Sequence, residues 1–243
     1  MKLSVIIPAY NEEKRLPKTL REIDKYLSQQ SYDSEIIVVN GGSTDRTPEI
    51  VREMMSEIKN LKLIERDGLG KGDAVKTGML EAQGDYRIFT DADNSTSIDQ
   101  VEKMWPWFEK GYDVVIGSRD VRGAVLDPPQ PWYRRLLGKI FRFLTHIFCG
   151  TWEILDSQCG FKGFTKRAAL DIFSKISIFG WAFDPEVLVI AKKLGYKIKE
   201  IPVVWKNDPQ SKVNFKGMVK MGIELLKIRW NILTKKYEPQ TKS

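Results

Sequence analysis

The stretch LSVIIP at residues 3–8 is a short apolar run that is typical of a buried strand in a parallel sheet, and EIIVV at residues 35–39 is a second such run. Between these runs, residues 14–28 carry four apolar side chains at helical spacing, namely Leu16, Leu20, Ile23 and Leu27. A strand, a helix and a strand in this order form one unit of a parallel sheet. The start of the chain therefore predicts a βαβ unit.

The same alternation continues through the first half of the chain. Apolar periodicity and turn residues predict a helix at residues 43–58, a strand at 61–65, a helix at 72–83 and strands at 86–90 and 114–117. The sequence contains no internal repeat and no low-complexity tract. We therefore expect an α/β fold with a mostly parallel central sheet flanked by helices.

The composition is that of an ordinary folded protein. Hydrophobic residues make up 42% and charged residues 29% of the 243 residues, which suits one domain with an appendage. Cys149 and Cys159 lack metal-ligand spacing and are too few for a disulfide framework, so we expect both to be buried in a cytoplasmic protein. The first apolar run ends at Pro8, and no run reaches the roughly 18 apolar residues of a membrane span, so we expect neither a signal peptide nor a transmembrane segment.

Positive charge is concentrated in two segments of the chain. The formal net charge is +7; residues 132–148 hold four Lys or Arg and no acid, and residues 206–243 hold nine against three acids. A basic surface of this kind implies a polyanionic partner, which is either nucleic acid or anionic lipid. The chain has no recognised nucleic-acid-binding module, so we favour lipid and expect no nucleic-acid partner.

Both basic segments also carry apolar and aromatic side chains. Residues 132–144 have the sequence WYRRLLGKIFRFL, and residues 215–237 contain apolar side chains three or four apart with lysines between them, namely Met218, Met221, Leu225, Ile228 and Ile232. This composition is typical of helices that lie in a membrane interface, and it predicts peripheral binding to an anionic membrane surface. Packing of the two helices on the sheet or on a second subunit is the alternative, which leaves an oligomer open.

Polar segments follow the predicted strands where a parallel sheet binds its ligands. In such sheets ligands lie at the carboxyl ends of the strands. Asp91 and Asp93 come directly after the fourth predicted strand, so both carboxylates can turn toward one ion. Hard oxygen ligands favour Mg²⁺ or Mn²⁺, and such an ion neutralises charge on a diphosphate leaving group. The pair therefore predicts a site for a divalent cation and a diphosphate.

Several motifs resemble those of one enzyme family. VIIPAYNE at residues 5–12 resembles the opening of the family 2 glycosyltransferases, which have the GT-A (nucleotide-diphosphosugar transferase) fold, and DAD at residues 91–93 falls where that family has its metal-binding Asp-x-Asp. The whole resemblance covers residues 2–213. Its later segments resemble the branch of dolichyl-phosphate β-glucosyltransferases and dolichyl-phosphate mannose synthases: GSR at 117–119, DSQCGFK at 156–162, GWAFDPE at 180–186, IPVVW at 201–205 and SKV at 211–213.

The resemblance implies roles for single residues. It assigns the nucleotide sugar to Pro8, Ala9, Tyr10, Glu12, Asn40, Gly42, Ser43, Lys71, Asp91 and Ala92. It makes Asp91 and Asp93 the ligands of Mg²⁺ or Mn²⁺, Asp93 and Asp156 the catalytic residues, and Arg119, Arg134 and Arg135 the ligands of an acceptor phosphate. A phosphate monoester is already largely ionised near neutral pH. We therefore expect Asp156 to orient the acceptor more than to remove a proton from it.

The function that the resemblance implies is that of an inverting glycosyltransferase. It would move a hexose from a UDP- or GDP-hexose to a polyprenyl (dolichyl) phosphate at the inner face of a membrane. Residues 1–205 would form the GT-A domain and residues 206–243 a basic amphipathic helical extension. The sequence NGGS at residues 40–43 stands where the family has Asp-Asp-Gly-Ser, which leaves the base open between uridine and guanosine. The alternatives are a family 2 transferase that acts on a sugar or glycan, and a catalytically silent relative that binds nucleotide or lipid.

Overall fold

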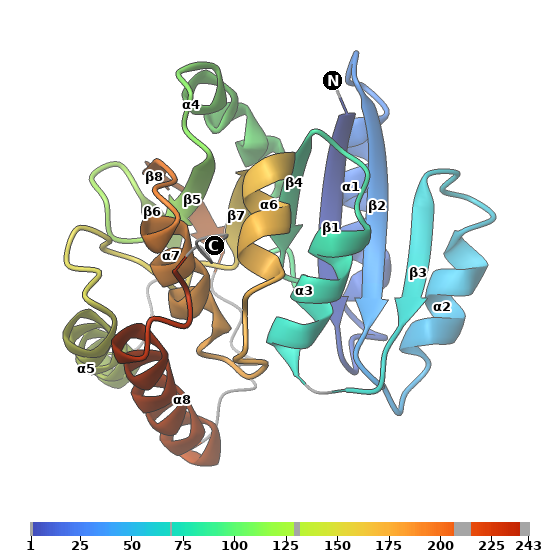
Figure 1. Cartoon of the computed structure of the whole chain (residues 1–243). Helices are drawn as coiled ribbons and strands as arrows, with labels where there is room; N and C mark the ends of the chain where they lie inside the picture. Colours follow the sequence, from blue (N-terminus) through green and yellow to red (C-terminus); the bar gives the residue numbers. More distant parts are fainter. Residues whose placement is uncertain (1, 69, 129–131, 207–214, 239–243) are drawn as a thin grey trace, which may run out of the picture.

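A seven-stranded sheet forms the centre of the molecule (Figure 1). The structure, a computed structural model of the chain, describes residues 2–68, 70–128, 132–206 and 215–238. It describes the backbone alone for residues 132–135, 215, 216 and 218. The strands of the sheet are β1 (Lys2–Ala9), β2 (Asp33–Asn40), β3 (Leu61–Glu65), β4 (Tyr86–Thr90), β5 (Val114–Ser118), β7 (Phe161–Thr165) and β8 (Ile198–Pro202).

The strand order is β3-β2-β1-β4-β7-β5-β8. β3, β2, β1 and β4 pair in parallel, as do β5 and β8, whereas β7 runs antiparallel between β4 and β5. The prediction of an α/β fold with a mostly parallel sheet is therefore confirmed. β7 and β8 were not predicted, because FKGFT and IKEIP interrupt their apolar residues with charge. A second, two-stranded sheet pairs β6 (Val125–Asp127) with β9 (Val204–Lys206).

Helices cover both faces of the main sheet, because successive strand residues point to opposite sides. Ile6 belongs to the core under α3, α6 and α7, which lie toward the viewer in Figure 1. Val5 and Ile7 belong to the opposite core, under α1, α2 and η1. These helices are α1 (Leu16–Leu27), α2 (Thr47–Met54), α3 (Lys71–Glu81), α6 (Lys166–Phe173) and α7 (Phe183–Lys193), with the 3₁₀ helix η1 (Ile98–Lys103) and the short α4 (Trp105–Glu109).

Two longer helices, α5 (Trp132–Cys149) and α8 (Phe215–Leu233), pack against each other at one end of the molecule (Figure 1). Leu225 and Ile228 of α8 are buried in the same core as α3, α6 and α7. The described part of the predicted extension therefore shares a core with the sheet, and its boundary at residue 206 stays a prediction. Among the described residues, no helix is both long and apolar enough to span a bilayer.

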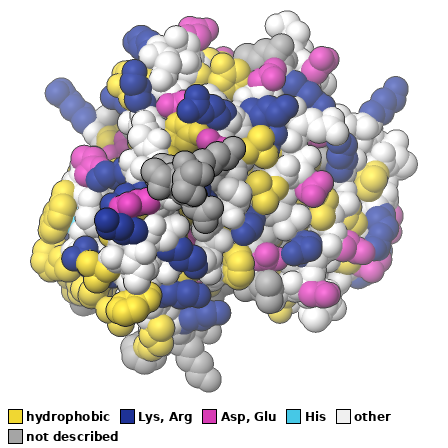
Figure 2. Space-filling view, viewed as in Figure 1, with side chains coloured by type: hydrophobic (Ala, Val, Ile, Leu, Met, Phe, Trp, Pro, Cys, Tyr) yellow, Lys and Arg dark blue, Asp and Glu magenta, His cyan; other side chains and the backbone are white. Residues whose placement is uncertain are grey.

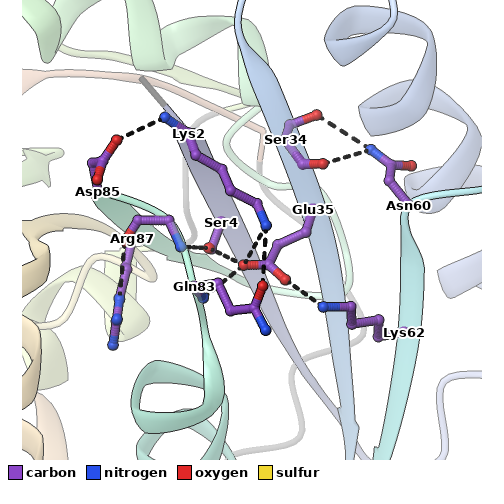
Figure 3. A network of polar contacts seen from close by, with 10 residues as sticks. Lys2, Ser4, Ser34, Glu35, Asn60, Lys62, Gln83, Asp85 and Arg87 are labelled. Atoms are coloured by element: carbon purple, nitrogen blue, oxygen red, sulfur yellow. Dashed lines mark hydrogen bonds and ion pairs between the residues drawn. The ribbon is translucent and has the colours of Figure 1, made fainter.

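A network of polar contacts occupies the edge of the sheet at which the parallel strands begin (Figure 3). The Glu35 carboxylate accepts a hydrogen bond from the Ser4 hydroxyl at 2.6 Å and one from the backbone N–H of Gln83 at 2.7 Å, and the Lys62 ammonium lies 2.7 Å from its other oxygen. Burial opposes ionisation, but these donors hold the pKa of Glu35 below its ordinary value. The network joins β1, β2 and β3 at the edge away from the predicted site.

Candidate active site

The predicted site residues gather where the parallel strands end. Pro8 and Ala9 end β1, Asn40 ends β2, and Asp91 and Arg119 follow directly on β4 and β5. β1 pairs in parallel with both β2 and β4, so their carboxyl ends lie at one edge of the sheet. Ligands of open α/β sheets bind at this edge.

The loops after β1 and β2 are joined by hydrogen bonds. The backbone N–H of Gly41 donates to the Ala9 carbonyl at 2.8 Å, and the backbone N–H of Asn11 donates to the Ser43 hydroxyl at 2.9 Å. The side-chain oxygen of Asn40, which replaces the aspartate of the family pattern, accepts the backbone N–H of Ser43 at 3.2 Å. Asn40 and Ser43 therefore shape the loop that was predicted to hold the nucleoside.

Other residues predicted for the nucleoside differ in their surroundings. Tyr10 is 54% exposed, and Gly42 forms a turn with a φ of 75°. Glu12 is buried and accepts two hydrogen bonds from the Arg15 guanidinium, each at 2.7 Å. Arg15 in turn lies 3.9 Å from a carboxylate oxygen of Asp93. Glu12 thus holds Arg15 beside the acidic pair, a link that the sequence did not indicate.

The acidic pair combines two differently bound carboxylates. The Lys71 ammonium lies 2.6 Å from Asp91, while Asp93 accepts the backbone N–H of Ser95 at 2.9 Å. Burial and the neighbouring charge of Asp91 raise the pKa of Asp93. Two carboxylates that repel each other at a partly exposed edge, with side chains 35% and 22% exposed, form a negative field that a cation would neutralise.

The donor set fits a hard divalent cation that also binds substrate. The oxygens of Asp91 and Asp93 are the ligand type that Mg²⁺ and Mn²⁺ prefer. Within the described part of the chain, no group of three or more acidic, histidine or cysteine side chains could hold a metal ion. A cation at this pair would therefore complete its coordination with water and with oxygens of a phosphate ligand.

The backbone beside the acidic pair leaves little space. A Cβ atom at Gly160 would overlap the carboxylate of Asp91, so any larger residue there would displace that carboxylate. On the other side, the buried Ala92 carbonyl accepts a hydrogen bond from the hydroxyl of Thr19 in α1 at 2.8 Å. The segment before β7 and the helix α1 therefore hold the pair from two sides.

Lys71, predicted to approach the donor, lies at the start of α3 against the acidic pair. Its ammonium lies 5.7 Å from the ring centre of Trp181 and 5.8 Å from that of Phe183. Burial opposes the charged form, but the carboxylates of Asp91 and Asp184 raise the pKa of Lys71. Lys71 is therefore a cation beside the acidic pair, and its predicted role toward the donor stays a prediction.

Arg119 and Asp156, predicted for the acceptor side, form a two-pronged ion pair. The guanidinium donates to one carboxylate oxygen at 2.7 Å and to the other at 2.9 Å, and the backbone N–H of Arg119 adds a third bond at 3.0 Å. Although Asp156 is buried, the Arg119 charge and these bonds hold its pKa far below the ordinary range. A carboxylate of this kind is a weak base, which favours the expected positioning role of Asp156 over removal of a proton.

The backbone of Arg134 and Arg135 lies in the first turn of α5, but their side chains lie outside the described residues. Their assignment to an acceptor phosphate therefore stays a prediction.

The structure adds a buried ion pair that sequence reasoning missed. The Lys162 ammonium lies 2.5 Å from the Asp184 carboxylate and donates to the Cys159 carbonyl at 2.5 Å. Both side chains are buried, and Asp184 also contributes to the field around Lys71. A lysine inside FKGF, between aromatic residues of a strand, was the available signal, because a buried charge requires a partner.

The sequence matches a known family and known proteins. Residues 4–173 match the family described as Glycosyl transferase family 2. The chain is 38% identical over 249 residues to a dolichyl-phosphate beta-glucosyltransferase of Trichomonas vaginalis, and the match covers 96% of this chain and 75% of that protein.

Two solved structures resemble the whole chain. Mannosyl-3-phosphoglycerate synthase from Rubrobacter xylanophilus superposes with a TM-score of 0.72 at 16% identity, over 100% of this chain and 77% of that one. Glucosyl-3-phosphoglycerate synthase from Mycobacterium tuberculosis, in complex with Mn²⁺, UDP and phosphoglyceric acid, gives a TM-score of 0.65 at 18% identity, over 99% and 80% of the two chains. At these identities the likeness concerns the fold, and it confirms the predicted GT-A fold.

Proposed function

This chain belongs to glycosyl transferase family 2, and on that premise we propose that it transfers a hexose, with inversion, from a UDP- or GDP-hexose to a polyprenyl (dolichyl) phosphate. The observation that carries the proposal is the 38% identity, over most of both chains, to a dolichyl-phosphate beta-glucosyltransferase. The Arg119–Asp156 pair supports a phosphate as the acceptor, because a fixed guanidinium suits a phosphate dianion.

The donor would bind at the ends of β1, β2 and β4. Asp91 and Asp93 would hold Mg²⁺ or Mn²⁺, and a cation bound there supplies positive charge to the diphosphate leaving group. A divalent cation is supported by the Mycobacterium tuberculosis relative of this fold, which contains Mn²⁺ together with UDP. Lys71 would add a second positive charge to the same diphosphate, since its ammonium lies 2.6 Å from Asp91.

The acceptor phosphate would bind to Arg119. The side chain of Arg119 is 24% exposed while that of Asp156 is only 4% exposed, so the pair presents its positive member to the site. Arg134 and Arg135, in the first turn of α5, would contact the same phosphate. The ionised phosphate oxygen would attack the sugar carbon directly, and a strong base is therefore unnecessary.

We further propose that the protein binds peripherally to the cytoplasmic surface of a membrane through α5 and α8. Apolar side chains of the two helices lie exposed, and Figure 2 shows them gathered at the lower left with Lys and Arg beside them. An exposed apolar surface bordered by positive charge suits an anionic membrane interface. This apolar helix face consists of Leu136, Leu137, Ile140, Phe143 and Ile147 of α5 and Val219, Ile223, Leu226, Trp230 and Leu233 of α8.

The decisive experiment is a panel of nucleotide sugars incubated with polyprenyl phosphate and Mg²⁺ or Mn²⁺. Extraction into organic solvent and mass spectrometry should find one hexose added to the lipid phosphate. The panel also identifies the base, which Asn40 leaves open. Transfer only to a water-soluble sugar or glycan would contradict the lipid acceptor, and tight nucleotide binding without any transfer would point to a silent relative.

A further inference from the structure

On the side opposite its exposed face, the helix α8 contacts the loop between α6 and α7. Ile223 is 62% exposed, whereas the next residue, Glu224, turns inward and accepts the backbone N–H of Ala182 at 3.0 Å. A Cβ atom at Gly180 would overlap the Glu224 carboxylate, so the carboxylate lies directly against the backbone there. Glu224 therefore links the apolar helix face to the loop between α6 and α7.

A second contact holds the same loop to the end of α8. The side-chain amide of Asn231 donates to the Ser177 hydroxyl at 3.0 Å and to the Tyr237 hydroxyl at 2.8 Å. Tyr237 donates to Glu186 at 2.6 Å, and Glu186 accepts the backbone N–H of Ile178 at 2.8 Å. These bonds fix the first half of the loop, whereas Glu224 contacts its second half.

The other side of this loop supports the segment that carries Lys71. The Phe179 carbonyl accepts the backbone N–H of Gly72 at 2.9 Å, and the Ile176 carbonyl accepts the Lys76 ammonium at 3.2 Å. A Cβ atom at Gly72 would come within 3.0 Å of Phe179, so helix α3 and the loop are in close contact. The loop is therefore bonded to α3 directly beside Lys71, the first residue of that helix.

We infer that Glu224 is a positioning residue, which couples contact between α8 and a membrane to the placement of Lys71 at the donor site. Helix packing transmits displacements of about 1–2 Å, because tightly packed elements move as bodies. At Gly72 the loop backbone and the Phe183 Cβ lie so close that there is little room to absorb such a displacement between the loop and α3. The inference rests on the proposed function, since it requires a membrane-bound state and a diphosphate near Lys71.

The test measures nucleotide affinity with and without a membrane, in the full chain and without acceptor. UDP and GDP, each with Mn²⁺, are titrated in parallel in buffer and with vesicles of phosphatidylcholine and phosphatidylserine. For the parent, vesicles should tighten binding of the preferred nucleotide about tenfold. Glu224→Ala should still bind vesicles but lose this gain, and its KM for the nucleotide sugar should rise while its KM for the lipid phosphate stays unchanged.

Three further variants separate positioning from general stability. Glu224→Gln keeps an oxygen for the Ala182 N–H and should restore the vesicle effect, whereas Gly180→Ala should lose it by displacing the carboxylate. Glu238→Ala removes an exposed carboxylate near Lys193 and should behave as the parent. The vesicle effect is a ratio of two affinities of the same folded variant, so a lower Tm does not by itself remove it. If Glu224→Ala does not fold, Glu224→Gln and Gly180→Ala test the inference.

The outcomes also separate this inference from the proposed function. In one outcome the parent protein binds vesicles and glycosylates the lipid while its nucleotide affinity is the same with and without vesicles. That result would overturn this inference and leave the proposed function standing. A Glu224→Ala variant with the full vesicle effect would do the same. A parent protein that neither binds vesicles nor modifies the lipid would overturn both.

Discussion

At the scale of single residues, two carboxylates of the candidate site differ through their surroundings. Asp156 is bound by Arg119 through both oxygens, which keeps it ionised. Asp93 is partly buried and lies beside Asp91, and both its desolvation and the charge of Asp91 raise its pKa. Arg119 pairs directly with Asp156, whereas Asp91 still raises the pKa of Asp93 although Lys71 and Arg15 lie nearby. The same residue type therefore suits positioning in one place and metal binding in the other.

The first prediction concerns Asp93. Replacing Asp93 with alanine should lower the rate of transfer at least about a hundredfold. The reason is that a metal ion stabilises the charge on the leaving group in the transition state by several kcal/mol. The fold should persist, as judged by circular dichroism and Tm. Excess chelator should inactivate the parent to a similar extent, and Asp99→Ala, an exposed carboxylate in η1, serves as the control. Full activity in excess chelator would remove the metal from the mechanism.

The second prediction concerns the polar network around Glu35. Glu35→Gln removes a buried charge that has fixed donors, and it should lower the free energy of unfolding at neutral pH by about 1–3 kcal/mol. The folded-state pKa of Glu35 lies below its ordinary value of 4.5, so its contribution is present above pH 4.5 and is lost as the pH falls through the folded-state pKa.

Denaturant unfolding at several pH values checks this sign. The stability difference between parent and Glu35→Gln should be largest above pH 4.5 and should shrink on acidification. Glu53→Gln, an exposed partner of Arg46, should differ little from the parent at any pH. A difference that grows toward low pH would contradict the assignment.

At the scale of elements, α5 and α8 each combine a buried and an exposed apolar side. Leu225 and Ile228 pack into the core, while Val219, Leu226 and Trp230 face outward. A helix that is apolar on both sides needs a second apolar contact besides the core. Positive charge beside the exposed side favours an anionic membrane as that contact.

The third prediction tests the apolar helix face. The double variant Phe143→Glu/Trp230→Glu should weaken vesicle binding at least about tenfold, because it places charge where apolar groups would enter the interface. Nucleotide affinity in buffer should be unchanged. Salt should release the parent from anionic vesicles, since surface charges are screened.

Leu170→Glu in α6 is the matched control, because Leu170 is also an exposed apolar residue but lies outside this face. It should bind vesicles as the parent does. If the parent is a dimer that the double variant dissociates, and vesicle binding is absent throughout, the face is instead an interface between two copies of the chain.

At the scale of the whole molecule, the site is assembled from two parts of the chain that β7 brings together. β1, β2 and β4 present the loops predicted for the donor, and β5 presents Arg119 for the acceptor. β7 lies between β4 and β5, and Gly160, just before it, touches Asp91. Donor and acceptor would therefore meet across this strand.

The fourth prediction concerns the stereochemistry of the product. Both oxygens of Asp156 are bound to Arg119, which makes this carboxylate unsuitable as a nucleophile for a covalent sugar intermediate. Direct in-line attack by the acceptor oxygen should therefore convert an α-linked donor into a β-linked product. Proton NMR of the anomeric centre measures this, and an α-linked product would contradict single displacement.

The sequence alone determined the features that depend on residues close together in the chain, above all the positions of the strands. The strands predicted at residues 61–65 and 86–90 agree with β3 and β4, and the other three predicted strands agree with theirs within two residues at each end. Apolar periodicity depends on near neighbours in the chain, so it can be read without tertiary contacts. The position of Asp91 and Asp93 at a strand end follows from the same reading.

Only the tertiary structure decided how distant residues meet. The insertion of β7 between β4 and β5, and the pairs Lys71–Asp91, Arg119–Asp156 and Lys162–Asp184, join residues 20, 37 and 22 positions apart. The sequence around each of these residues does not indicate which distant residue is its partner. Partners are selected by burial, since a charge removed from water is stable only beside its opposite. That selection requires the packed fold, which brings these side chains together at one edge of the sheet.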